Sequence, residues 1–330
     1  MSFKSLYSKL MTCFISNKDE RRAARDKMIF ECLNIEQALE KSKKVKLLMT
    51  IVLKNEEEII EQNIRFHYAM GVDGFIVTNH NSTDNSVEIL EKLKKEGLVL
   101  EIINENGLEH RHSIWVHRMI KIAKNKYNAD WVINADADEF YYSNDLNLKI
   151  SILKYPKINV YKVESTFSFA IETENFLENP YFLKNPLKTF EEDSLEISNL
   201  IKNKYTIEGA RSCPKVIHKT NGYLKIIDGN HMVSMRNAVV APCNDIVLYH
   251  YNIPSFKRYE DKAKRWMSNA HLLTNGENYL TKIIDMYKDG KLKEYFDSIY
   301  GEEIRELLFD KGIVQKDYSV INFMKYNGLV

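Results

Sequence analysis

Between residues 46 and 134 the sequence alternates four times between short apolar runs and amphipathic helical patterns. The first run, at 46–53, is apolar almost throughout, as expected of a parallel strand that is covered on both faces. Further strands are predicted at 74–78, 98–103 and 131–134, with helices between them. This alternation predicts an α/β fold with an open, mostly parallel, twisted sheet and helices on both faces.

The two ends of the chain differ from this central region. Residues 1–44 combine helical spacing of apolar side chains with a charged run, and predict an N-terminal helical segment. Residues 45–254 are interpreted as one domain with two halves, 45–140 and 141–254. Residues 255–330 predict a C-terminal helical extension, which begins after Pro254 with Ser255 as its N-cap.

Charge and cysteine content narrow the class of protein. The formal net charge is +1, and so balanced a chain is not a general nucleic-acid binder. The four cysteines have neither zinc-site spacing nor the density of a disulfide scaffold; they are Cys13, Cys32, Cys213 and Cys243. Because no signal peptide is evident, we expect reduced thiols in a cytoplasmic protein. Residues 1–40 leave two interpretations open: a helix lying on an anionic membrane, or a helix packed on the domain.

Polar clusters follow the predicted strands at their carboxyl ends, where such sheets bind ligands. Residues 54–56 follow the first strand, 79–84 the second, and Asp136-Ala137-Asp138 the fourth. We expect Asn55 to cap the first helix. In extended backbone Asp136 and Asp138 point to the same side, and they repel unless a cation lies between them. Mg²⁺ or Mn²⁺ would suit them and would also accept diphosphate oxygens. The alternative is a solvated turn with Asp138 as a cap.

The segment from about residue 46 to residue 262 resembles a family 2-type glycosyltransferase with the GT-A fold, closest to the branch shared with family 92. The resemblance is carried by residues 50–56, 79–86, 134–140, 248–251 and 255–256. It implies transfer of a sugar from a nucleotide-diphosphate donor, with uridine as the expected base, to a glycan or glycolipid. It also implies a requirement for Mn²⁺ or Mg²⁺ and, by expectation, inversion at the anomeric carbon. Residues 45–140 would then bind the nucleotide and 141–254 the acceptor.

The resemblance also implies roles for single residues. The base pocket would be lined by Thr50, Val52, Asn55 and Glu56. Asp84 would contact the base or ribose, Asp136 would lie near the ribose or the metal, and Asp138 would bind the metal. Lys262 and Arg265, on the late helix, either neutralise the leaving diphosphate or form a solvated basic face. Arg111, His112 and Arg118, around the start of the third helix, are either phosphate or sugar contacts or exposed charges.

The sequence leaves two residue assignments undecided. A late histidine is expected to complete the metal or diphosphate site, and the candidates are His231, preferred because Gly229 permits a close approach, and His250. An inverting enzyme also needs a carboxylate base on the acceptor side, for which Glu208 and Asp228 are candidates. A retaining enzyme would need no such base.

Two other function classes compete with this interpretation. One is a non-catalytic nucleotide-sugar-binding or scaffold protein of the same fold. The other is an Asp-x-Asp phosphatase, which is disfavoured because its nucleophile would follow the first strand. A chain rich in Lys and Asn, with only 12 Gly and 6 Pro, is typical of an AT-rich bacterial genome. We therefore expect a role in lipopolysaccharide, capsule or other surface polysaccharide synthesis at the inner face of the cytoplasmic membrane.

Overall fold

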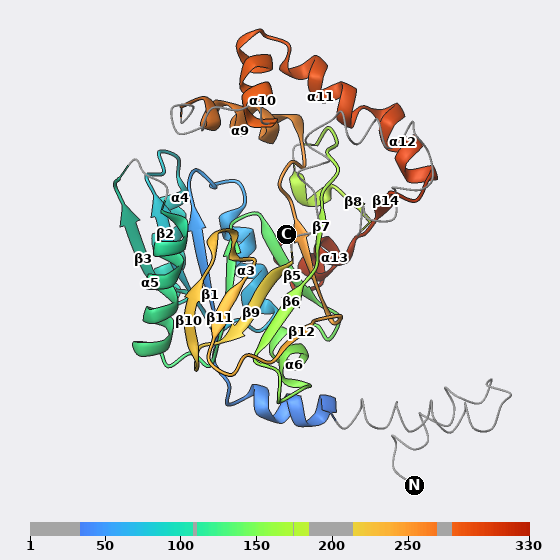
Figure 1. Ribbon diagram of the computed structural model, residues 1–330. Helices are drawn as coiled ribbons and strands as arrows, with labels where there is room; N and C mark the ends of the chain where they lie inside the picture. Colours follow the sequence, from blue (N-terminus) through green and yellow to red (C-terminus); the bar gives the residue numbers. More distant parts are fainter. Residues whose placement is uncertain (1–33, 108–110, 174, 185–213, 269–278) are drawn as a thin grey trace, which may run out of the picture.

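The computed structural model describes residues 34–107, 111–173, 175–184, 214–268 and 279–330 (Figure 1). Most of the predicted N-terminal segment lies outside these residues, as do Cys13, Cys32 and Cys213; residues 34–42 are helical. Cys243 is a free, buried thiol, as expected. No helix of the described ranges has both the length and the apolar character needed to cross a bilayer.

A seven-stranded sheet forms the centre of the molecule, in the order β12-β6-β9-β4-β1-β2-β3. Its parallel part comprises β1 (Leu47–Leu53), β2 (Gly74–His80), β3 (Val99–Glu105) and β4 (Trp131–Asp136). The other strands are β9 (Lys215–Lys219), antiparallel to β4 and β6, β6 (Val160–Val163), and β12 (Val240–Pro242), parallel to β6. The predicted α/β class, with an open, mostly parallel sheet, is confirmed.

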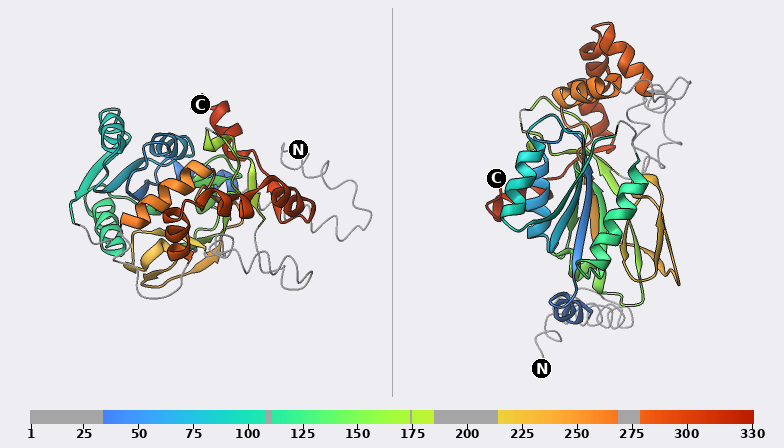
Figure 2. Two further views of the ribbon diagram at one scale, coloured as in Figure 1. Left: turned by 90° about the horizontal axis from the view of Figure 1, so that it is seen from above. Right: turned by 90° about the vertical axis from the view of Figure 1, so that its left-hand side faces the viewer.

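Helices cover both faces of this sheet, as the side view in Figure 2 shows. Successive side chains of β1 alternate between the faces, as a strand requires. Met49 and Ile51 pack with α3 (Ile60–Ala69) and α4 (Ser86–Lys95), whereas Leu48 packs with α5 (His112–Asn125). Because β1 is apolar on both sides, it can only lie in the centre of such a three-layered arrangement.

The second half of the domain is built mainly from short strands. A three-stranded sheet joins β5 (Glu139–Ser143), β13 (Ile246–His250) and β7 (Ser165–Phe167), with β13 in the middle. Also in this half are α6 (Leu148–Leu153), the 3-10 turns η1 (Phe176–Glu178) and η3 (Asp228–Asn230), β8 (Tyr181–Leu183), and the hairpin of β10 (Tyr223–Ile226) and β11 (Val233–Met235).

The C-terminal extension is mainly helical, as predicted, but it also returns to the first domain. Four helices share a second apolar core: α9 (Phe256–Ser268), α10 (Tyr279–Lys288), α11 (Leu292–Tyr300) and α12 (Glu302–Asp310). A strand that the sequence analysis did not predict, β14 (Val314–Lys316), then pairs with β8. The last helix, α13 (Ser319–Tyr326), buries Phe323 and Met324 in the main core.

The expectation that Asn55 caps the first helix is wrong, because α3 begins only at Ile60. Asn55 instead adopts a left-handed conformation with φ of +56°, which asparagine tolerates better than most residues. Its side chain is engaged elsewhere: the backbone N–H of Thr83 donates to Asn55 Oδ1 at 2.8 Å. By contrast, Ser255 directly precedes α9, and its Oγ accepts a long hydrogen bond of 3.4 Å from the N–H of Arg258.

Candidate active site

The loops after β1 and β2, residues 54–59 and 81–85, are tied together by hydrogen bonds and are called the paired loops below. The N–H of Asn55 donates to Ser82 Oγ at 2.9 Å, and the N–H of Glu57 donates to Asp84 Oδ2 at 3.0 Å. Glu57 in turn accepts from both the backbone and the side chain of Asn85. Two of the three predicted polar clusters therefore form one continuous platform at the carboxyl edge of the sheet.

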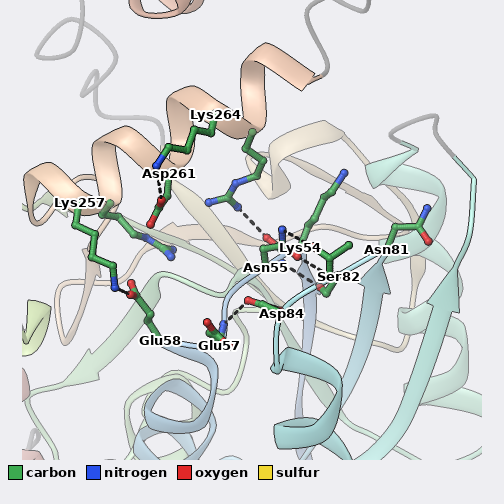
Figure 3. Close-up of a pocket in the computed structure, with 13 residues that line it drawn as sticks. Lys54, Asn55, Glu57, Glu58, Asn81, Ser82, Asp84, Lys257, Asp261 and Lys264 are labelled. Atoms are coloured by element: carbon green, nitrogen blue, oxygen red, sulfur yellow. Dashed lines mark hydrogen bonds and ion pairs between the residues drawn. The ribbon is translucent and has the colours of Figure 1, made fainter. Parts of the chain in front are cut away.

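A cavity of about 730 Å³ lies between the paired loops and α9 (Figure 3). Asn55 and Asp84, which the sequence assigned to the donor, are among its lining residues. Thr50 and Val52 are not, because both are buried in the sheet, where the hydroxyl of Thr50 donates to Asn134 Oδ1 at 2.8 Å. The cavity is large enough for a ligand of nucleotide size.

Helix α9 presents three cations at helical spacing toward this edge: Arg258, Lys262 and Arg265, called the cationic row below. Arg258 and Arg265 both pair with Glu56, and Arg265 approaches Glu56 Oε1 at 2.8 Å. Arg265 also donates to the carbonyl of Lys54 at 2.8 Å. Glu56 thus lies beneath the row and anchors it to the loop after β1.

Asp138 pairs with Lys262, the remaining cation of the row, and also lies 4.0 Å from Arg258. Its Oδ2 lies 3.2 Å from Lys262 Nζ, and its Oδ1 lies 3.2 Å from His250 Nε2. Burial on its own would raise the pKa of Asp138, but the charges of Lys262, His250 and Arg258 outweigh this and hold the pKa well below its usual value. The carboxylate is therefore ionised at neutral pH.

Asp136 lies at the end of β4 and is more open, with 37% of its side chain exposed. Lys215 Nζ lies 3.2 Å from Asp136 Oδ2, and His112 Nε2 lies 3.6 Å from Oδ1. These charges lower the pKa of Asp136 against the opposing effect of desolvation. Lys215 also pairs at 2.9 Å with the fully buried Glu139, whose pKa is raised by burial.

Side chains of helix α3 form hydrogen bonds with the backbone of the turn between the two aspartates. The amide Nδ2 of Asn63 donates to the carbonyls of Ala137 and Glu139, at 2.9 and 2.8 Å. One turn later, His67 Nε2 accepts the N–H of Tyr141 at 2.9 Å. Since that N–H can only donate, Nδ1 carries the proton and faces the carbonyl of Asn63 at 2.8 Å. Asn63 and His67 are both fully buried, so they fix the backbone that carries Asp138.

The burial of His67 predicts a loss of stability in acid. Desolvation lowers its pKa from 6.5 to about 3, so the unfolded chain takes up a proton in this range and the folded chain does not. Its contribution to the free energy of unfolding therefore falls by about 1.4 kcal/mol per pH unit as the pH drops from about 6.5 toward 3. Urea unfolding at several pH values measures this slope. The slope should be shallower in a His67→Gln variant, and an unchanged slope would contradict the assignment.

The remaining residues that the sequence predicted for the site are spread over several elements. His231 is in the loop after η3, where its Nδ1 faces the carbonyl of Pro214 at 3.3 Å. Asp228 begins η3, which packs against α5 and β9, the elements that carry His112 and Lys215. Glu208 lies outside the described residues. Arg118 pairs with Glu105, and Arg111 is exposed.

Several residues of this site were not assigned a role from the sequence, among them Arg258, Lys215 and Asn63. Arg258 had a readable signal, because it lies one helical turn before Lys262 on the same predicted face. Lys215 begins a predicted strand and Asn63 lies inside a predicted helix, where neither residue type is unusual. Only the pairing of distant segments places them beside the two aspartates.

Comparison with known proteins places this site in a family. The model of glycosyltransferase family 92 matches residues 51–287, which contain the paired loops, both aspartates, His250 and the cationic row. No curated protein sequence matches the chain.

Solved structures similar to this one include TarS residues 1–349 from S. aureus, with 12% identity over 80% of this chain and 74% of that chain, and a TM-score of 0.39. Glucosyl-3-phosphoglycerate synthase from Mycobacterium tuberculosis, in complex with Mn²⁺, uridine diphosphate and phosphoglyceric acid, has 14% identity over 67% and 75%, and a TM-score of 0.38. Similarity at this level carries no argument about function. The family match covers well over half of the sequence and confirms the family 92 resemblance: the chain belongs to glycosyltransferase family 92 and is a glycosyltransferase.

Proposed function

We propose that this glycosyltransferase uses a nucleotide-diphosphate sugar, with uridine as the base, and that the cavity of Figure 3 holds the nucleotide. The observation that carries the proposal is the convergence of the cationic row with the paired loops and Asp138. The leaving group of such a donor is a diphosphate, and its developing negative charge needs preorganised positive groups in a site that partly excludes water. Arg258, Lys262 and Arg265 meet that requirement.

A divalent ion, Mn²⁺ or Mg²⁺, is the second part of the proposal. Within the described residues no three His, Cys, Asp or Glu side chains gather as a metal-binding group. Asp138 Oδ1 and His250 Nε2, 3.2 Å apart and both facing the edge, still provide the oxygen and nitrogen donors that Mn²⁺ accepts. This donor pair fits a metal whose other positions are filled by diphosphate oxygens and water. We therefore favour His250 over His231 as the ligand, with Asp136 beside it, and the metal would supply positive charge to the leaving group.

The transfer itself follows the expected inverting course. The acceptor hydroxyl oxygen bonds to the anomeric carbon as the bond from that carbon to the diphosphate breaks, and a carboxylate takes the hydroxyl proton. Asp228 and Glu208 remain the candidates for this base. The acceptor is proposed to be a glycan or glycolipid of a bacterial surface polysaccharide or lipopolysaccharide, reached from the cytoplasm with peripheral membrane contact through residues 1–44.

The test is incubation with a panel of nucleotide sugars and Mn²⁺, with and without candidate acceptors. We expect release of free nucleoside diphosphate from one donor, and a donor-specific rise in melting temperature because a ligand that binds the folded state stabilises it. Release of inorganic phosphate would instead indicate a phosphatase. Binding of a donor without any release, across all acceptors, would indicate a scaffold protein.

A further inference from the structure

The carboxylate of Asp138 is already faced by a basic nitrogen at each oxygen. His250 lies at Oδ1 and the ammonium of Lys262 at Oδ2, both at 3.2 Å, and the Asp138 side chain is only 10% exposed. A divalent ion on Asp138 would therefore lie within a few ångströms of a positive charge, which repels it strongly because the carboxylate is largely shielded from water. The ammonium of Lys262 therefore opposes binding of the ion that Asp138 is proposed to bind.

The charge balance of the cluster indicates when this changes. Glu56 and Asp138 contribute two negative charges, and Arg258, Lys262 and Arg265 contribute three positive charges, so the cluster already has an excess of one positive charge. A divalent ion alone would increase this excess. A nucleoside diphosphate that arrives with the ion would compensate it, because its oxygens carry negative charge.

Lys262 is the member of the row that is able to move. Arg258 and Arg265 are both held by Glu56, and Arg265 has a further hydrogen bond to the carbonyl of Lys54. Lys262 forms its ion pair with Asp138 through one flexible side chain. A lysine ammonium on a four-carbon stem reorients more easily than an arginine held at two points.

We infer that Lys262 and the divalent ion exchange on Asp138. This inference rests on the proposed function. In the free enzyme Lys262 neutralises Asp138 and keeps metal affinity low. When a nucleoside diphosphate binds, its oxygens attract Lys262 away from Asp138, and the metal takes the carboxylate. Metal and nucleotide therefore bind together, and Lys262 ends on the leaving group, where its charge assists departure.

The inference predicts that removing Lys262 tightens metal binding. In a Lys262→Met variant without nucleotide, we expect the dissociation constant for Mn²⁺, measured by electron paramagnetic resonance of the free ion, to fall by about tenfold. With saturating uridine diphosphate the gain should disappear, because the wild-type lysine has then already left Asp138. Lys262→Arg, which keeps the charge, should not tighten metal binding. Lys288→Met, an exposed lysine on α10, is the control for loss of one positive charge.

The experiment distinguishes failure of the exchange from failure of the proposed function. If wild type binds Mn²⁺ with uridine diphosphate but Lys262→Met has equal or weaker affinity without nucleotide, exchange is wrong and the proposed function stands. If wild type binds no Mn²⁺ with or without the nucleotide, the metal site itself is wrong and both proposals fall. Circular dichroism tests whether the Lys262→Met variant is folded. If it is not, the Mn²⁺ affinity of Lys262→Gln is measured instead and judged by the same criteria.

Discussion

Replacing Asp138 by Asn lowers the turnover number by at least about a thousandfold, while the protein stays folded. The change keeps the size of the side chain but removes the charge that faces both His250 and Lys262. On the proposed function, it would take away one metal ligand and leave the positive groups around the leaving diphosphate without their organising carboxylate. Loss of a single preorganised electrostatic group commonly costs about 10²–10³ in rate, and loss of the metal adds to this.

The measurement is steady-state release of nucleoside diphosphate, with Mn²⁺ affinity measured in parallel. Asp289→Asn, at an exposed position directly after α10, is the matched control and should behave as wild type. Retention of more than about a tenth of the wild-type rate by Asp138→Asn would be incompatible with a direct ligand role.

Replacing Lys215 by Met should have the largest effect on stability, lowering the free energy of unfolding by about 3–5 kcal/mol. Lys215 is buried and lies between Asp136 and the fully buried Glu139, at 3.2 and 2.9 Å. Without it, Glu139 would be left as a buried carboxylate with no compensating cation, which has to take up a proton or disrupt the site. Breaking a buried pair from one side is costly for this reason.

Urea unfolding of five proteins tests this explanation: wild type, the single variants Lys215→Met and Glu139→Gln, their double variant, and a control at Lys225. The double variant Lys215→Met/Glu139→Gln should recover a large part of the loss, because its buried amide carries no charge. Lys225→Met, at an exposed position on β10, should leave stability unchanged. Full additivity of the two single changes would show that Lys215 does not stabilise the fold through Glu139.

The sequence predicted the parallel half of the sheet well, because its signal is local. β1 is apolar on both faces, and the helices α3, α4 and α5 lie between the parallel strands as expected. The prediction ended the fourth strand at residue 134, whereas β4 continues through Ala135 and Asp136. Asn55 was misassigned because its bonds to Ser82 and Thr83 cross between loops, and a single stretch of sequence does not reveal them.

The site was only half predictable for the same reason. That Asp136 and Asp138 share a ligand-binding edge follows from their position after a strand. That His250 lies beside them follows from the antiparallel pairing of β13 with β5, whose register sets His250 opposite Glu139. That Glu56 meets Arg258 depends on a contact between residues 202 positions apart. No local pattern encodes such pairings, so the sequence alone favours His231, near Gly229, and the proposal of His250 rests on the fold.

The acidic and the basic side chains of this site lie far apart in the sequence, and this has a consequence for the nascent chain. Asp138 leaves the ribosome 124 residues ahead of Lys262, and Glu56 leaves 202 residues ahead of Arg258. During synthesis the acidic half therefore exists for a time without the counter-charges of α9, a helix that packs against α10 and α11 in the second apolar core. A nascent chain that has not yet released α9 therefore holds Glu56 and Asp138 without the three cations that neutralise them in the folded protein, Arg258, Lys262 and Arg265.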